Sequence, residues 1–173
     1  MGGYLKIDQN LYREVFSFCP AAVAIVTTSI NSKPYGFTAT SVTPVSLDPP
    51  LVLFCIDKRS GSHEFFYSCT YFAINFLTQN QKNLAVKFAR RIKDKFADTN
   101  FTYKDENPPI LPDAISSMLL RRSSNYDEGD HTIIVGQVID ANIYSLDNIE
   151  ALGYYRRSFI SSYHPSSNVN SDS

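Results

Sequence analysis

Residues 35–62 read YGFTATSVTPVSLDPPLVLFCIDKRSGS, and this stretch decides the fold and holds most of the functional motifs. Small and hydroxyl side chains at 38–41 let a ligand approach the backbone closely and supply donors for polar ring edges. Asp48, Pro49 and Pro50 lead rigidly into the apolar strand 51–56, which we expect to be buried on both faces. The strand delivers the chain to a turn at 57–62, where two cations and two serines before a helix-like segment favour phosphate binding.

The composition is that of one ordinary globular domain. With 173 residues, 43% of them hydrophobic, the chain is long enough for a sizeable core, and its net charge of −1 does not point to nucleic acid or an anionic membrane as a partner. No apolar run approaches about 18 residues and the N-terminus lacks a signal-peptide core, so we expect a cytoplasmic protein. Cys19, Cys55 and Cys69 form no paired motif and the three histidines are scattered, so we predict reduced, buried thiols and no metal site.

Hydrophobic periodicity predicts few helices and many strands. Helices are predicted at 8–18, with Asp8 as N-cap, at 63–69 and at 80–92. Strands are predicted at 22–28, 51–56, 71–77 and 131–144, with a loop at 94–112, a polar turn at 123–129 and an acidic linker at 147–152. The sum is a mostly β fold, an antiparallel β-barrel with flanking helices. Residues 1–160 should form a single domain, and the tail 161–173, rich in Ser and Asn, should be disordered.

The order and spacing of these motifs resemble the flavin reductase-like family. TATSVTPVSLDPPLVLFCIDKRSGS matches the family's T-A-x-S segment, its S-x-D-P-P-L segment, its apolar strand and its basic-and-serine turn. GDHT at 129–132, YYR at 154–156 and DKF at 94–96 match further segments, so the resemblance spans about residues 12–159. It implies an FMN-binding split barrel with Greek-key-like antiparallel strands, a homodimer, and a strand at 113–122, whose period is ambiguous by itself.

The resemblance also implies where a flavin would bind. The ring and ribityl chain would lie against 38–41, with the strand end 75–77 beside the ring, and the basic-and-serine turn would bind the phosphate with help from a lysine of the following helix. The expected flavin-binding residues are Thr38, Ala39, Thr40, Ser41, Ser46, Asp57, Lys58, Arg59, Ser60, Ser62, Asn75, Phe76, Leu77 and Lys87. The basic residues around that helix end, 87–95, have a simpler interpretation as a solvated face with charges that favour the helix dipole.

The nicotinamide site is expected at Gly129, Asp130 and His131, together with Tyr155 and Arg156. His131 would bind and orient NAD(P)H, because hydride transfer itself needs no proton donor. A lone histidine that opens a strand is also often structural, and Gly129 can simply serve a turn with positive φ. The chain has no GxGxxG, so no Rossmann module is predicted.

The leading prediction is therefore an NAD(P)H:flavin oxidoreductase that transfers hydride from nicotinamide C4 to flavin N5. It would supply reduced FMN or FAD to a separate oxygenase component, since this chain is too small to contain an obvious oxygenase domain. The alternative is a flavin-binding carrier or sensor without turnover. A third candidate, an oxidase of the pyridoxamine-phosphate type, is disfavoured by the S-x-D-P-P and GDH segments. The residues do not decide between FMN and FAD or between NADH and NADPH.

Overall fold

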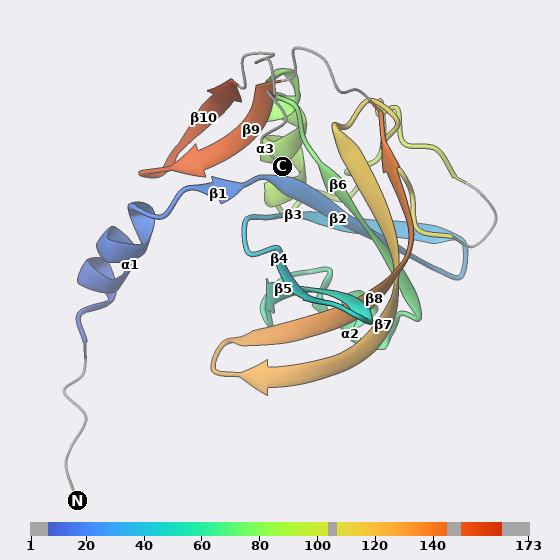
Figure 1. The fold of residues 1–173 in the computed structure, drawn as a ribbon, viewed down its shortest axis with the longest axis horizontal. Coiled ribbons are helices and arrows are strands. Elements are labelled where there is room, and N and C mark those ends of the chain that lie inside the picture. The colour runs from blue at the N-terminus through green and yellow to red at the C-terminus, as the bar shows by residue number, and fades with distance from the viewer. Residues whose placement is uncertain (1–6, 104–106, 145–149, 164–173) are drawn as a thin grey trace, which may run out of the picture.

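Two antiparallel sheets make up most of the fold (Figure 1). This computed structural model describes residues 7–103, 107–144 and 150–163. The larger sheet has the strand order β3-β2-β6-β7-β8-β5-β4, and the smaller has the order β1-β9-β10. The larger sheet contains β2 (Ala24–Ile30), β3 (Lys33–Ala39), β4 (Thr43–Leu47), β5 (Pro50–Asp57), β6 (Tyr71–Phe76), β7 (Ser116–Glu128) and β8 (His131–Ile143).

The remaining elements are a smaller sheet and the helices. The smaller sheet contains β1 (Ala21–Ala22), β9 (Glu150–Tyr155) and β10 (Ser158–Tyr163). The helices are α1 (Gln9–Ser17), α2 (His63–Ser68), the 3₁₀ turn η1 (Gln79–Gln81) and α3 (Lys82–Ala89). The predicted mostly β, antiparallel architecture with flanking helices is confirmed.

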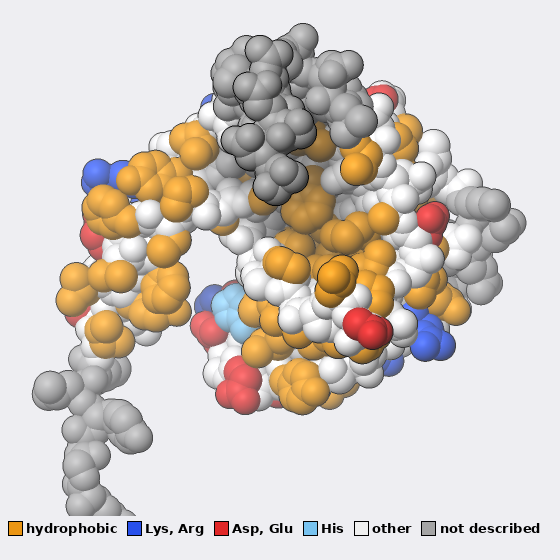
Figure 2. Space-filling model, in the orientation of Figure 1, with side chains coloured by type: hydrophobic (Ala, Val, Ile, Leu, Met, Phe, Trp, Pro, Cys, Tyr) orange, Lys and Arg blue, Asp and Glu red, His pale blue; other side chains and the backbone are white. Residues whose placement is uncertain are grey.

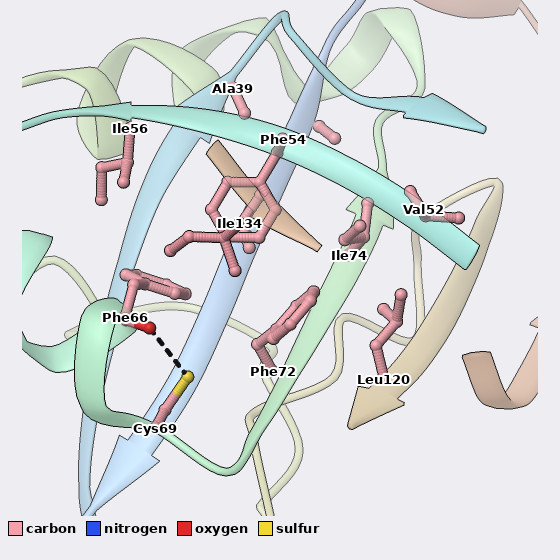
Figure 3. Packing of buried hydrophobic residues seen from close by; sticks show 12 residues of the cluster. Ala39, Val52, Phe54, Ile56, Phe66, Cys69, Phe72, Ile74, Leu120 and Ile134 are labelled. Carbon is pink, nitrogen blue, oxygen red and sulfur yellow. Dashed lines mark hydrogen bonds between the residues drawn. The ribbon is translucent and has the colours of Figure 1, made fainter. Parts of the chain in front are cut away.

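Aromatic rings fill the interior of the larger sheet. Phe54, Phe66 and Phe72 are fully buried and come from β5, α2 and β6 (Figure 3). The Phe54 ring meets the Phe66 ring edge-on, with centroids 5.8 Å apart, and meets the Phe72 ring edge-on at 5.1 Å. Such edge-to-face pairs add about 0.5–1.5 kcal/mol beyond the burial of area, so α2 is held firmly to the strand that precedes it.

β5 buries only every second side chain. Val52, Phe54 and Ile56 are at most 7% exposed, whereas the residues between them are half-buried. The prediction that this strand is buried on both faces was therefore wrong for the single chain. A strand in a barrel wall directs alternate side chains into the core and out of it, whatever their hydrophobicity.

The larger sheet is left open between its two ends, so the barrel is split. β3 and β4 are the edge strands, and no backbone ladder joins β3 to β5. The side chain of Ser41 bridges this gap: its Oγ accepts a hydrogen bond from Cys55 N (3.0 Å) and donates one to Cys55 O (3.2 Å). α3 packs beside the gap, with Phe88 against Gly36, where a Cβ atom would lie only 2.9 Å from Phe88 Cε1. Gly36 therefore permits the close approach of α3.

Two elements end at different residues from those predicted. β7 continues to Glu128, so 123–129 is not a polar turn, and only Gly129 and Asp130 connect β7 to β8. Pairing with β8 along its whole length outweighs the polar composition of this segment. Gly129 has φ of +57°, the left-handed conformation expected for such a turn. α3 ends at Ala89, so Ile92 lies beyond the helix to which it was assigned.

The N-terminal helix stands apart from the body (Figures 1 and 2). Asp8 caps α1 as predicted, accepting from Asn10 N (3.2 Å) and Leu11 N (3.3 Å). No residue of α1 is buried, and Cys19, just after the helix, is exposed, which contradicts its predicted burial. Within residues 7–103, 107–144 and 150–163, no helix is both long and apolar enough to cross a bilayer.

At the C-terminal side, two predicted irregular segments overlap strands. β9 begins at Glu150, inside the predicted acidic linker, and β10 continues to Tyr163, inside the predicted tail. The rest of both predictions, 147–149 and 164–173, falls outside the described residues.

Candidate functional site

A cleft of about 1330 Å³ occupies the split in the barrel. Its walls are β3, the end of β5 with the turn 57–62, and the segment that follows α3. These elements are far apart in sequence and meet because β3 and β5 face each other without pairing. The predicted site residues that line the cleft are Thr38, Ala39, Thr40, Ser41, Asp57, Arg59, Ser60, Ser62 and His131.

The open edge of β3 turns backbone groups toward the cleft. Just before β2, Val23 O accepts from Leu77 N (3.1 Å), so the odd-numbered residues of β2 direct their backbone groups toward β6. The even-numbered residues of β2 therefore bond with the odd-numbered residues of β3 that lie opposite them. The backbone N–H and C=O of Gly36 and Thr38 consequently point away from β2, to the side where the cleft lies.

The contacts of Gly36 confirm this direction. Its carbonyl accepts from Ser62 Oγ (3.3 Å) and from Lys95 Nζ (3.2 Å), which both approach from the cleft walls. The N–H of Thr38 has no partner among the described residues on that side and is available to a ligand. A flat ligand with acceptors and donors along one edge can pair with such a strand edge.

Several of the hydroxyls predicted to touch a ligand instead hold the walls together. Thr38 Oγ1 donates to Ala85 O in α3 (2.6 Å), and Ser62 Oγ donates to β3. Ser41 forms the bridge to Cys55 described above. Thr40, by contrast, is exposed at the cleft and has no side-chain partner among the described residues. The hydroxyl-rich segment therefore shapes the cleft as much as it offers groups to a ligand.

Arg59 lines the cleft and is paired with Asp57 from the end of β5. Its Nε and Nη2 atoms lie 3.1 and 2.8 Å from the two carboxylate oxygens, and its backbone N donates to Asp57 as well (2.7 Å). These bonds hold the pKa of Asp57 well below its ordinary value and raise that of Arg59. The side chain of Arg59 is still 74% exposed, so its remaining N–H groups are accessible to an anion.

Lys58 points away from the cleft, although the sequence grouped it with Arg59. Its Nζ donates to Gly129 O (3.0 Å) and its backbone N donates to Asp130 O (3.0 Å), both at the tip of the β7–β8 hairpin. Successive side chains in this turn diverge, so only one of the two adjacent cations faces the cleft. Lys58 thus fastens the turn to the hairpin that carries His131.

A second contact joins the start of α2, just after the turn 57–62, to the β7–β8 hairpin. His63 Nε2 lies 2.8 Å from Thr132 Oγ1, and Thr132 Oγ1 donates to Asp127 Oδ1 (2.6 Å). Since the single hydroxyl proton goes to the carboxylate, His63 must be the donor to Thr132, which sets its tautomer. We call Lys58, His63, Thr132 and Asp127 the hairpin clamp. Its effect is to hold the start of β8 against the start of α2.

His131 opens β8 and lies opposite Asp57 in the ladder with β5. Its Nδ1 is 2.6 Å from Asp130 Oδ1, and this hydrogen bond lowers the pKa of Asp130. The side chain is 44% exposed and lines the cleft. The structure therefore brings the predicted nicotinamide residue and the predicted phosphate turn into the same cleft.

Five other predicted residues lie elsewhere in the chain. Asn75 is fully buried, donates to Ile25 O (3.1 Å) and accepts from Leu111 N (2.8 Å), while its neighbours Phe76 and Leu77 pack in the core. These three side chains serve packing because β6 runs through the centre of the sheet. The remaining two are Lys87, which donates to Ala97 O, and the exposed Ser46, which donates to Pro49 O.

Tyr155 and Arg156 are also outside the cleft of their own chain. Tyr155 is the last residue of β9, and Arg156 begins the two-residue turn to β10, where Arg156 N donates to Ser17 O (2.8 Å). The Arg156 guanidinium stacks over the Phe18 ring at 4.5 Å and lies 3.8 Å from Glu14. This turn belongs to the smaller sheet and does not line the cleft.

The sequence interpretation missed one wall of the cleft. Arg90, Arg91, Lys93 and Lys95 were interpreted as a solvated helical face, yet all four line the cleft because α3 ends before them. Lys95 is half-buried, and burial lowers its pKa. The family segment DKF at 94–96 lies next to these cations in the sequence, and it could have indicated that they belong to the site.

Comparison with known proteins identifies the family of this chain. The model of the flavin reductase like domain matches residues 16–162. The chain belongs to the flavin reductase-like family. A reductase subunit of stachydrine N-demethylase from Rhizobium meliloti is 35% identical over 86% of this chain and 64% of its own length, so the chain spans less than two thirds of that relative.

The match covers a larger share of the length of two other family members. An NADH-dependent FMN reductase of Agrobacterium fabrum is 38% identical over 78% of this chain and 76% of its own. The structure of an NADH:FAD oxidoreductase from Streptomyces globisporus, in complex with NAD and FAD fragments, superposes with a TM-score of 0.84. It is 30% identical and covers 93% of this chain and 96% of its own, which confirms the split-barrel fold.

Proposed function

We propose that this protein is an NAD(P)H:flavin oxidoreductase that delivers reduced flavin to a separate oxygenase component. One observation carries the proposal: His131, Arg59 and the open edge of β3 line a single cleft in a chain of the flavin reductase-like family. The similarity to a reductase subunit of stachydrine N-demethylase supports the role as one component of a larger system.

The residues at the cleft fit a flavin nucleotide. The free backbone groups at Thr38 suit the polar edge of an isoalloxazine ring, and Thr40 lies next to it. Arg59 and Ser60 would hold the phosphate, as the basic-and-serine motif predicts. When bound, a flavin supplies N5 as the hydride acceptor, so the protein needs no nucleophile of its own. His131, oriented by Asp130, would hold the nicotinamide over the ring.

We further propose a homodimer in which a second copy completes the cleft. The apolar side chains of α1 have no cover in the single chain: Leu11, Val15 and Phe16 are 55–58% exposed. Figure 2 shows hydrophobic side chains gathered along α1 and again on the body around β4, β7 and β8. Exposed apolar surface of this extent is typical of an interface. A second copy would also bring its own Tyr155 and Arg156 to the cleft, which matches their predicted role.

Light scattering tests the assembly. At micromolar concentration, the mass should be about twice the 19.5 kDa of one chain. A monomer that binds flavin tightly would contradict the proposed dimer.

Oxidation of NADH and NADPH, measured with FMN and with FAD in turn, tests the activity. We expect flavin-dependent oxidation with at least one pairing, together with bleaching of the flavin spectrum in the absence of oxygen. Flavin binding without any oxidation of either nicotinamide would instead identify a carrier or sensor. Failure to bind either flavin would refute the proposal, including the assignment of the cleft.

A further inference from the structure

Cationic side chains outnumber acidic ones in the lining of the cleft. Six cationic side chains and two acidic ones line it among the described residues. Asp57 already neutralises Arg59, so the turn 57–62 adds little net charge to the cleft. In the described part of the chain, no carboxylate lies within 4.0 Å of Arg90, Arg91 or Lys93. The uncompensated positive charge is therefore concentrated on the wall after α3.

This wall is fastened at both ends rather than hanging free. Arg91 Nη2 donates to Arg59 O, across the cleft from α3. Lys95 Nζ donates to Phe88 O (2.8 Å) and to Gly36 O (3.2 Å), which ties the other end to α3 and β3. Two of the cations thus position the segment, while Arg90 and Lys93 have no partner among the described residues and are exposed.

The size of the cleft leaves room for a second group. Pockets filled by one small ligand usually measure about 300–1,000 Å³, and this cleft is larger, at about 1330 Å³. A mononucleotide has one phosphate, which Arg59 and Ser60 would bind. A dinucleotide has additional phosphate beyond it, and an uncompensated cluster of cations favours such a group.

We infer that Arg90, Arg91 and Lys93 form a second phosphate subsite, which binds the phosphate that a dinucleotide has and FMN lacks. The inference rests on the proposed function, because both phosphates belong to ligands of one cleft. The dinucleotide is either FAD or the nicotinamide nucleotide, and the two share the chemistry of an adenylate phosphate. If the phosphate is that of FAD, the subsite would make this chain selective for FAD over FMN.

A double variant, Arg90→Gln with Lys93→Gln, tests the subsite without removing the anchoring contacts of Arg91 and Lys95. Affinities for FMN and FAD are measured by quenching of flavin fluorescence, and KM by oxidation of NADH and NADPH. If the phosphate is that of FAD, the Kd for FAD should rise about tenfold while that for FMN changes less than about twofold. If it is that of the nicotinamide nucleotide, flavin affinities should be unchanged and KM for NADH and NADPH should rise about tenfold.

Lys82→Gln is the matched control, because it removes a cation from the opposite end of α3, outside the cleft. It should leave all four ligands unaffected. High ionic strength should reduce the same affinity in the wild-type protein: the preference for FAD over FMN in the first case, and the affinity for NADH and NADPH in the second. Unchanged binding of every ligand in the double variant, or equal losses for FMN and FAD, would overturn the subsite alone. A wild-type protein that binds no flavin would overturn the proposed function with it.

Discussion

Replacing Thr132 with valine should lower the stability of the fold and loosen the position of His131 at the cleft. Thr132 is fully buried, and the variant keeps its shape while removing the bonds to His63 (2.8 Å) and Asp127 (2.6 Å). A neutral hydrogen bond contributes about 1 kcal/mol and one to a charged group about 1.5–3 kcal/mol. Because Asp127 is 51% exposed, water would replace part of its bond. We therefore expect the free energy of unfolding to fall by about 2 kcal/mol.

Denaturant unfolding and steady-state kinetics, run together, measure this effect. The loosened start of β8 should raise KM for the nicotinamide nucleotide while flavin affinity stays near that of the wild type. Thr132→Ser keeps both hydrogen bonds, should lose only about 1 kcal/mol for the missing methyl group, and should restore KM. Thr28→Val, which removes one bond to Tyr71 O (2.7 Å) outside the cleft, should lower stability without changing KM.

Two results would refute this reasoning about the hairpin clamp. A Thr132→Val protein within about 0.5 kcal/mol of the wild type in stability would show that the two bonds contribute little. Equal increases in KM for the valine and serine variants would show that the hydroxyl does not position His131.

Four further predictions follow from the site. Arg59→Ala should weaken FMN binding about tenfold and leave riboflavin binding unchanged; equal losses in titrations of the two ligands would contradict a phosphate contact. His131→Ala should raise KM for NAD(P)H and lower kcat/KM about ten- to a hundredfold with an unaltered Tm, whereas a lowered Tm with normal kinetics would mark a structural histidine. Gly36→Ala should cost about 1–3 kcal/mol of stability because its Cβ meets Phe88, and thermal melting would detect this. The pKa of Asp130 in the folded protein lies below its ordinary 3.8, so the ionised carboxylate stabilises the fold above pH 3.8. This stabilisation is lost as the pH falls through the pKa of the folded state. The Tm of the wild-type protein should therefore exceed that of Asp130→Asn at neutral pH, and the difference should shrink below about pH 4.

The sequence predicted which segments form the candidate site, but not which side chains of each segment face the cleft. Motif order pointed to Arg59 and His131, and both line the cleft; Arg59 follows β5 by two residues and His131 opens β8, two strands that clear local patterns predict. The same motif included Lys58, which faces the hairpin instead. Neighbouring residues of a turn point in different directions, and composition carries no information about which of them faces a ligand.

The sequence alone predicted the strands at 22–28, 51–56, 71–77 and 131–144, the cap at Asp8 and the family to which the motifs point, because each depends on residues close together in the chain. It did not predict the strands β3, β4, β9 and β10. Only the tertiary structure decided that the sheet stays open between β3 and β5 and that Ser41 spans the gap with one side chain. It also decided that Asn75 is buried in the core and that the cations after α3 form a wall of the cleft. These features are contacts between segments distant in sequence, and hydrophobic periodicity does not report which segments meet.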